Sequence, residues 1–130
     1  MRESNELFTL CNEVYERTGW ETPDWWGKSA YSGEYRVVPD KQYEVKAFAD
    51  EGDAGSFYDH LPHYTPDYLL EKLPATVKND FDGGNDYIIL YKKGKSWYAD
   101  YMGRFKRQKS DTPLKALLKL TLKLHEERLL

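Results

Sequence analysis

The feature that most constrains the fold of this sequence is a leucine-rich segment near its end. Thr112 can cap the free N–H groups of a helix, and Pro113 suits the first helical position. At helical spacing, six leucines fill an arc of roughly 200°: Leu114, Leu117, Leu118, Leu120, Leu122 and Leu124. Opposite them, Lys115, Lys119 and Lys123 form a narrow stripe that we predict faces solvent. So wide an apolar arc requires a sheet and at least one further element to cover it.

Two more helices are predicted upstream. The first runs from Ser4 to Thr18 and ends at Gly19, with Leu7, Leu10, Cys11 and Val14 on its apolar face. Cys11 is therefore interpreted as a small core residue. The second is short: Thr65 caps it, Pro66 opens it and it runs through Leu73.

Four segments are predicted to be strands, in two hairpins. Residues Tyr35–Val38 and Tyr43–Ala49 flank a turn at Pro39-Asp40, and Tyr87–Tyr91 and Ser96–Tyr101 flank a lysine-rich turn. The stretches Trp20–Gly33 and Asp50–His63 contain glycine and proline and are predicted to be irregular.

At 130 residues, the chain has the length of one domain, residues 1–130. We predict an α+β fold: one antiparallel sheet of four or five strands with helices packed on it, in the order α-β-β-α-β-β-α. No apolar run approaches the roughly 18–20 residues that a membrane helix needs, and the N-terminus lacks a signal-peptide pattern. With one cysteine and hence no internal disulfide, the expected location is a reducing compartment, the cytoplasm, away from the membrane.

The charge of the chain is strongly divided along its length. Up to Asp86 there are 8 Lys+Arg against 18 Asp+Glu, and from Tyr87 onward there are 11 against 4. The formal net charge of −3 hides both halves. Such a division is typical of binding surfaces, or of one half of a molecule neutralising the other.

From Thr65 onward, about half of the chain resembles small bacteriophage and prophage proteins, including the group described as phage ABA-sandwich proteins. The resemblance lies in the short helix after Thr65, the hairpin with Trp97 on its return strand, and the segment Asp111-Thr-Pro-Leu-Lys-Ala-Leu-Leu-Lys-Leu. It implies helix–sheet–helix layers and a viral or prophage origin, and with that origin the cytoplasm of a bacterial host. It brings no catalytic residues.

No motif of this sequence predicts catalysis, a metal or another cofactor. His60 and His63 flank Pro62 and lack the further ligands of a zinc site. Counting from Asp80, the sixth and twelfth positions of a calcium loop hold Asn85 and Tyr91 in place of glycine and glutamate. A phosphate-binding glycine loop and a nucleophile elbow are also absent from the sequence. We therefore expect a protein that is not an enzyme and acts by binding.

Two surfaces are candidates for that binding. The first is an aromatic cluster typical of protein interfaces, made of Trp20, Trp25, Trp26 and Tyr31. The alternative interpretation of this cluster is that it closes the open edge of the core. The second is a basic segment interleaved with aromatic residues, made of Lys92, Lys93, Lys95, Arg104, Lys106, Arg107 and Lys109. Such a segment can bind nucleic acid, although lysines at hairpin turns also serve solubility.

The leading hypothesis is a phage or prophage accessory protein that binds a host or phage protein, with the acidic half facing a basic partner. The alternative hypothesis is a nucleic-acid-binding protein that uses the basic segment 92–109.

Overall fold

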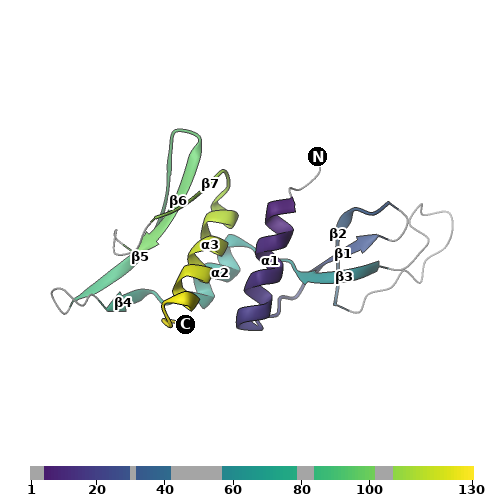
Figure 1. Ribbon diagram of the computed structural model, residues 1–130, viewed down its shortest axis with the longest axis horizontal. Helices are drawn as coiled ribbons and strands as arrows, with labels where there is room; N and C mark the ends of the chain where they lie inside the picture. Colours follow the sequence, from purple (N-terminus) through teal and green to yellow (C-terminus); the bar gives the residue numbers. More distant parts are fainter. Residues whose placement is uncertain (1–4, 30–31, 42–56, 79–83, 102–106) are drawn as a thin grey trace. The chain divides into compact units, whose positions relative to one another are not determined.

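Three helices and seven strands in two antiparallel sheets form the described part of the chain, which confirms the α+β class. The computed structural model describes residues 5–29, 32–41, 57–78, 84–101 and 107–130 (Figure 1). Its backbone contacts divide the chain into two units, residues 1–63 (unit 1) and 64–130 (unit 2). The expectation of one sheet is wrong, because the strands of each unit pair only among themselves in the described residues. That the two units form one domain stays a prediction.

Unit 1 contains one helix and a three-stranded sheet of order β2-β1-β3. The elements are α1 (Asn5–Thr18), β1 (Trp25–Ser29), β2 (Tyr35–Val38) and β3 (Phe57–Pro62). Strands β1 and β3 lie where irregular structure was predicted, so that prediction is wrong there. In β1, Trp25, Gly27 and Ser29 are buried and the residues between them are half-buried. The sequence does not show this alternation, because a glycine and a serine occupy two of the three buried positions and a second tryptophan lies between them. The predicted strand Tyr43–Ala49 lies outside the described residues, and β2 pairs with β1 instead.

The core of unit 1 forms around Trp25, Val38 and Phe57. Tyr15 of α1 meets the Trp25 ring edge-on at 5.4 Å between ring centroids. The predicted apolar face of α1 is confirmed, since Leu7, Leu10, Cys11 and Val14 are all buried. Gly19 ends the helix at φ 69°, a left-handed conformation that glycine adopts without strain.

Unit 2 contains two helices and a four-stranded sheet of order β4-β5-β6-β7. The elements are α2 (Pro66–Lys72), β4 (Thr76–Lys78), β5 (Asn85–Lys93), β6 (Ser96–Tyr101), β7 (Gln108–Ser110) and α3 (Pro113–Glu126). Both predicted caps are confirmed: Thr65 Oγ1 accepts from the Tyr68 N–H, and Thr112 Oγ1 from the Lys115 N–H, each at 3.2 Å. Strands β4 and β7, three residues each, are too short to show a period and were missed.

Helix α3 packs against β5, β6 and β7, as the leucine arc predicts. Ala116, Leu117, Leu118, Leu120 and Leu124 are fully buried. Within unit 2 the described helices lie on one side of the sheet (Figure 1), so the helix–sheet–helix layering that the resemblance implies is not seen in this unit.

The solvent stripe predicted for α3 is wrong at one position. Lys115 is 6% exposed, whereas Lys119 and Lys123 are half-buried. The Lys115 ammonium lies 2.6 Å from the Asp111 carboxylate, which precedes the helix cap. Two features explain how a lysine is buried here. Its ammonium group has an ion partner in Asp111, and its aliphatic stem can lie along apolar surface.

Candidate nucleic-acid interface

The register of the sheet in unit 2 shows which residues share a face, because neighbouring side chains on a strand point to opposite sides. Ala99 and Tyr101 are fully buried on the side that α3 covers, and the Tyr101 hydroxyl donates to the Pro74 carbonyl oxygen at 2.7 Å. On the opposite side, Tyr91 pairs with Tyr98, and Tyr98 with Lys109. We call the hairpin end of that side the open face: Tyr91, Lys93, Tyr98, Arg107 and Lys109. None of the described helices of unit 2 covers it (Figure 1).

The centre of the open face is a stack of two tyrosines and an arginine. The Tyr91 and Tyr98 rings lie 5.2 Å apart between centroids and only 16° from parallel. Arg107 Nη1 donates to the Tyr91 hydroxyl at 2.8 Å, and its guanidinium carbon lies 5.7 Å from the Tyr98 ring centroid. The hydrogen bond to Tyr91 raises the pKa of Arg107 further, so the guanidinium keeps its charge. This arrangement joins β5, β6 and the residue before β7.

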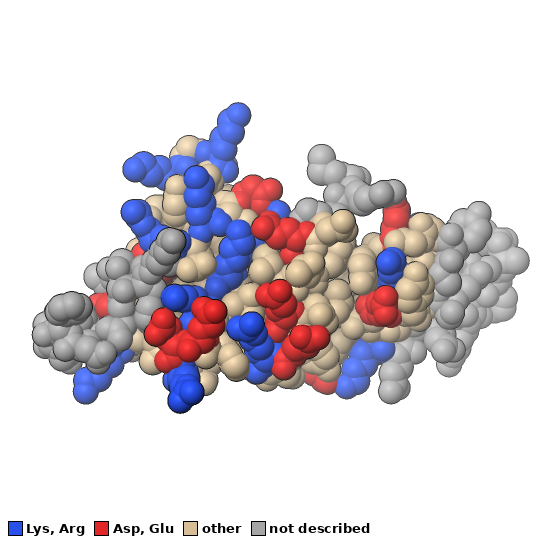
Figure 2. Space-filling model, viewed as in Figure 1, with Lys and Arg blue, Asp and Glu red and all other residues tan. Residues whose placement is uncertain are grey.

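Lysines surround this stack. Lys93, Lys95 and Lys109 are all exposed, and Figure 2 shows Lys and Arg side chains gathered around the end of the β5–β6 hairpin. Gly94, at φ 66°, makes the tight turn between Lys93 and Lys95. The hairpin therefore concentrates positive charge next to stacked aromatic rings.

The structure divides the predicted basic segment between two faces. Lys92 lies on the helix side of the hairpin, with its Nζ 5.9 Å from the Trp97 ring centroid. Arg104 and Lys106 lie outside the described residues. Of the predicted seven, Lys93, Lys95, Arg107 and Lys109 are placed at or beside the open face.

Asp100 was not predicted as part of any site, yet it lies on the same side of the sheet, opposite Ile89. It is 1% exposed; its Oδ1 accepts from the Tyr101 N–H at 2.6 Å, and its buried Oδ2 has no hydrogen-bond partner among the described residues. Its negative charge contributes to the raised pKa of Arg107. The alternation of β6 reveals its side of the sheet but not its burial. The carboxylate of Asp100 thus makes this end of the sheet side less positive than the end at the hairpin turn.

The predicted aromatic cluster does not form one exposed surface. Trp25 belongs to the core of unit 1 and is 4% exposed, so the prediction that it lies on an interface surface is wrong. Trp26, next in the strand, points to the other side and meets the Phe8 ring edge-on at 5.3 Å. Trp20 is half-buried, and Tyr31 lies outside the described residues. The core-closing interpretation therefore holds for Trp25.

The two histidines considered as metal ligands, His60 and His63, lie in different local environments. His60 lies in β3, and the ring of His63 packs 4.7 Å from that of Trp26. Within the part of the chain that the structure describes, no three His, Cys, Asp or Glu side chains are grouped to hold a metal ion. The segment 79–83 of the calcium-like loop lies outside the described residues. No helix in the described ranges is long and apolar enough to cross a membrane.

Comparison of the chain with protein-family models, curated proteins and solved structures finds no match. The resemblance to phage proteins thus stays a prediction, and the functional argument depends on the geometry of the residues themselves.

Proposed function

We propose that the protein binds single-stranded nucleic acid on the open face of unit 2, as a non-enzymatic accessory protein of a phage or prophage. The observation that carries this proposal is the Tyr91–Tyr98–Arg107 stack with lysines beside it. The phage assignment comes from the resemblance of the second half of the chain.

The chemistry of the stack suits an exposed base. Aromatic rings and arginine guanidinium planes both stack on bases, and each base stacked on an aromatic ring contributes about 1–3 kcal/mol. Stacking requires that the face of the base be free, which is true of single strands and not of paired duplexes. Lys93, Lys95 and Lys109 can neutralise the phosphates of the strand.

The charge of the two units also favours nucleic acid at unit 2. Residues 1–63 carry 6 Lys+Arg against 13 Asp+Glu, a net of −7. Residues 64–130 carry 13 against 9, a net of +4. The two units therefore differ in the sign of their net charge, although the charge boundary of the sequence, after Asp86, lies within unit 2. The positive unit is the one that presents the stacked rings. The protein-binding hypothesis is less well supported, because Trp25 is part of the core.

Fluorescence anisotropy with labelled oligo-dT and oligo-U of about 15 nucleotides, within the site size of single-strand binders, tests the proposal directly. We expect binding at low salt and weaker binding to a duplex of equal length. Tyr98→Ala should weaken binding about 5- to 150-fold, the equivalent of one lost stacking contact. Tyr98→Phe, which keeps the ring, should bind as the unchanged protein does.

Two variants that each remove one positive charge distinguish binding at a defined site from non-specific electrostatic attraction of nucleic acid. Lys93→Gln removes a cation beside the stack. Lys78→Gln removes an exposed cation of β4, which pairs with the opposite end of β5 at Asn85. Lys93→Gln should reduce the slope of log affinity against log salt by about 0.7, the value for one phosphate contact on a single strand. Equal effects of the two variants, or no binding at low salt, would contradict the proposal.

A further inference from the structure

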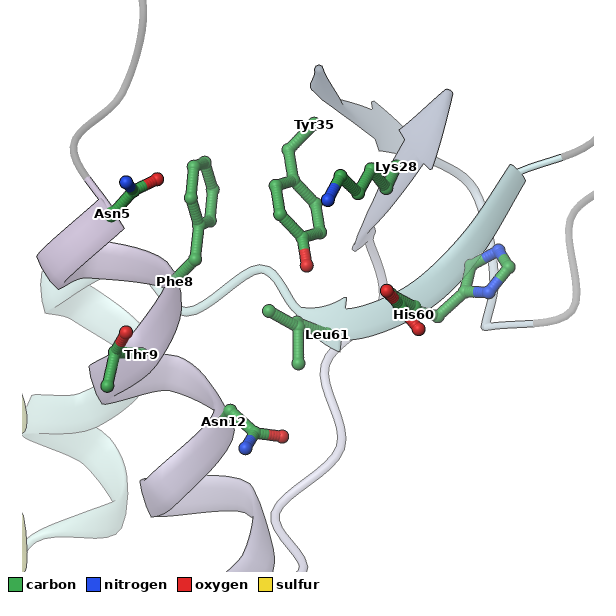
Figure 3. A pocket seen from close by; sticks show the side chains of 9 residues that line it. Asn5, Phe8, Thr9, Asn12, Lys28, Tyr35, His60 and Leu61 are labelled. Carbon is green, nitrogen blue, oxygen red and sulfur yellow. The ribbon is translucent and has the colours of Figure 1, made fainter. Parts of the chain in front are cut away.

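Unit 1 contains a pocket that no sequence motif indicated. It has a volume of about 580 Å³ and lies between α1 and one side of the three-stranded sheet (Figure 3). Small-molecule sites typically measure about 300–1,000 Å³. All its lining residues belong to unit 1, and of these the sequence drew attention only to Asp59 and His60, as metal ligands of a motif that the sequence disfavours.

One wall of the pocket is aromatic. The Phe8 and Tyr35 rings are stacked with 4.2 Å between centroids, and the Tyr35 hydroxyl points into the cavity (Figure 3). Burial, with the negative charge of Asp59 beside it, raises the pKa of Tyr35, so its hydroxyl stays protonated as a donor. Leu61 adds an aliphatic surface. This wall suits an apolar or aromatic group.

The pocket also holds one cation whose position is fixed by aromatic rings. Lys28 pairs in register with Tyr35 on one side and Tyr58 on the other. Its Nζ lies 6.0 Å and 5.8 Å from the centroids of those two rings. Rings attract the ammonium group without neutralising its charge. Among the described residues, no carboxylate forms an ion pair with Lys28, so the charge remains available to a ligand.

A carboxylate lines the same pocket on the neighbouring strand. Asp59 is exposed and has φ 49°, a left-handed conformation that costs free energy for a residue other than glycine. The register between β1 and β3 shifts at this point of the ladder, and such a bulge re-aims a side chain. Asp59 makes no ion pair with the described residues, Lys28 included. The pocket thus offers a positive and a negative group that do not satisfy each other.

We infer that this pocket binds a small zwitterion of the α-amino-acid class that carries an aromatic or aliphatic side chain. Lys28 takes the carboxylate, Asp59 takes the ammonium, and the side chain lies against Phe8 and Leu61. Asn12 and Thr9, which line the α1 side, supply further hydrogen-bonding groups (Figure 3). A phosphate or a simple anion is disfavoured because Asp59 repels it, and a simple cation because Lys28 does.

Isothermal titration of the whole protein with L-phenylalanine and two analogues tests this inference. The analogue 3-phenylpropionate lacks the ammonium, and 2-phenylethylamine lacks the carboxylate. Each should bind about 10- to 100-fold more weakly than L-phenylalanine, the range for a lost hydrogen bond to a charged group. Failure of L-phenylalanine to bind at about 1 mM, a concentration that detects even weak ligands, would overturn the inference.

Two variants test whether Lys28 binds the carboxylate of the ligand and Asp59 its ammonium. Lys28→Gln should make L-phenylalanine and 2-phenylethylamine bind equally, and Asp59→Asn should do the same for L-phenylalanine and 3-phenylpropionate. Asn tolerates the left-handed backbone, and the exposed position makes Asp59→Asn safe for folding even if Lys28→Gln unfolds the unit. Lys78→Gln in unit 2 is the control of equal charge and should leave all three affinities unchanged. If each variant weakens all three ligands equally, the zwitterion assignment is wrong.

Discussion

At the scale of single residues, Gly27 of β1 lies so close to the Phe57 side chain of β3 that it leaves little space for a side chain of its own. A Cβ atom built at Gly27 would lie 3.1 Å from the Phe57 Cβ and 3.2–3.3 Å from two of its ring carbons. Because the Phe57 Cβ belongs to the base of the side chain, it cannot swing away. Gly27→Ala is therefore expected to destabilise the protein by about 1–3 kcal/mol, as overpacking does, measured by urea unfolding.

The double variant Gly27→Ala/Phe57→Ala is the control for that clash. Alanine keeps the Cβ atom but removes the two ring carbons, so if steric crowding is the cause, the double variant loses less stability than the two single variants together. Strictly additive losses would show that the clash is not what Gly27 avoids.

Tyr101 is the residue whose titration should matter most for stability. Burial raises the pKa of its hydroxyl above that of a free tyrosine, so folding favours the neutral phenol. The stabilisation is complete below the pKa of the unfolded chain, about 10, and is lost as the pH rises beyond it. Tyr101→Phe should cost about 1 kcal/mol near pH 8, because the hydrogen bond to the Pro74 carbonyl is lost. Above about pH 10 its stability should fall less steeply than that of the unchanged protein. Parallel pH profiles from urea unfolding would contradict this assignment.

At the scale of elements, α3 begins at a capping interaction that can be removed cleanly. Thr112 Oγ1 accepts from the Lys115 N–H in the first helical turn, where backbone N–H groups have no carbonyl of their own helix to bond. Thr112→Ala should lower the free energy of unfolding by about 1 kcal/mol, whereas Thr112→Ser keeps the hydroxyl and should stay close to the unchanged protein. Thermal unfolding measures both. An equal loss in both variants would show that the threonine methyl group, and not the cap, stabilises this end.

The elements with a clear local signal are those that the sequence predicted. Periodicity and caps identified α1, α2 and α3. An apolar run identified part of β5, and alternation identified β6. Strand β3 was missed because polar Asp59 and His60 interrupt its apolar pattern, and Asp59 takes a left-handed conformation that no propensity indicates.

The candidate sites were predictable only as far as local sequence patterns indicate them. The sequence identified Lys93 and Arg107 as cations, but only the register places Arg107 against the Tyr91–Tyr98 stack. The pocket of unit 1 depends on pairing between strands separated in sequence by the segment 42–56. Local sequence patterns contain no information about such pairing.

At the scale of the whole molecule, each unit has its own sheet, with one helix in unit 1 and two in unit 2 among the described residues. The net charges of −7 for residues 1–63 and +4 for residues 64–130 also differ in sign. The boundary between the acidic and the basic part of the sequence, after Asp86, lies inside unit 2, so the sign of the net charge distinguishes the units without marking where they divide. The division into units assigns the proposed nucleic-acid surface and the zwitterion pocket to different units, so a variant of one site need not alter the other.

Unfolding of the whole molecule can test whether the two units are also independent in stability. Because each unit holds its own core, we expect calorimetry to resolve two thermal transitions. Gly27→Ala should shift one of them and Thr112→Ala the other, by about 4–8 °C for each 1 kcal/mol lost in a unit of this size. A single transition that both variants lower would mean that residues 1–130 unfold as one domain, as the length of the chain predicted. In that case a ligand of either site would raise the stability of the whole chain, because binding to the folded state stabilises everything that unfolds with it.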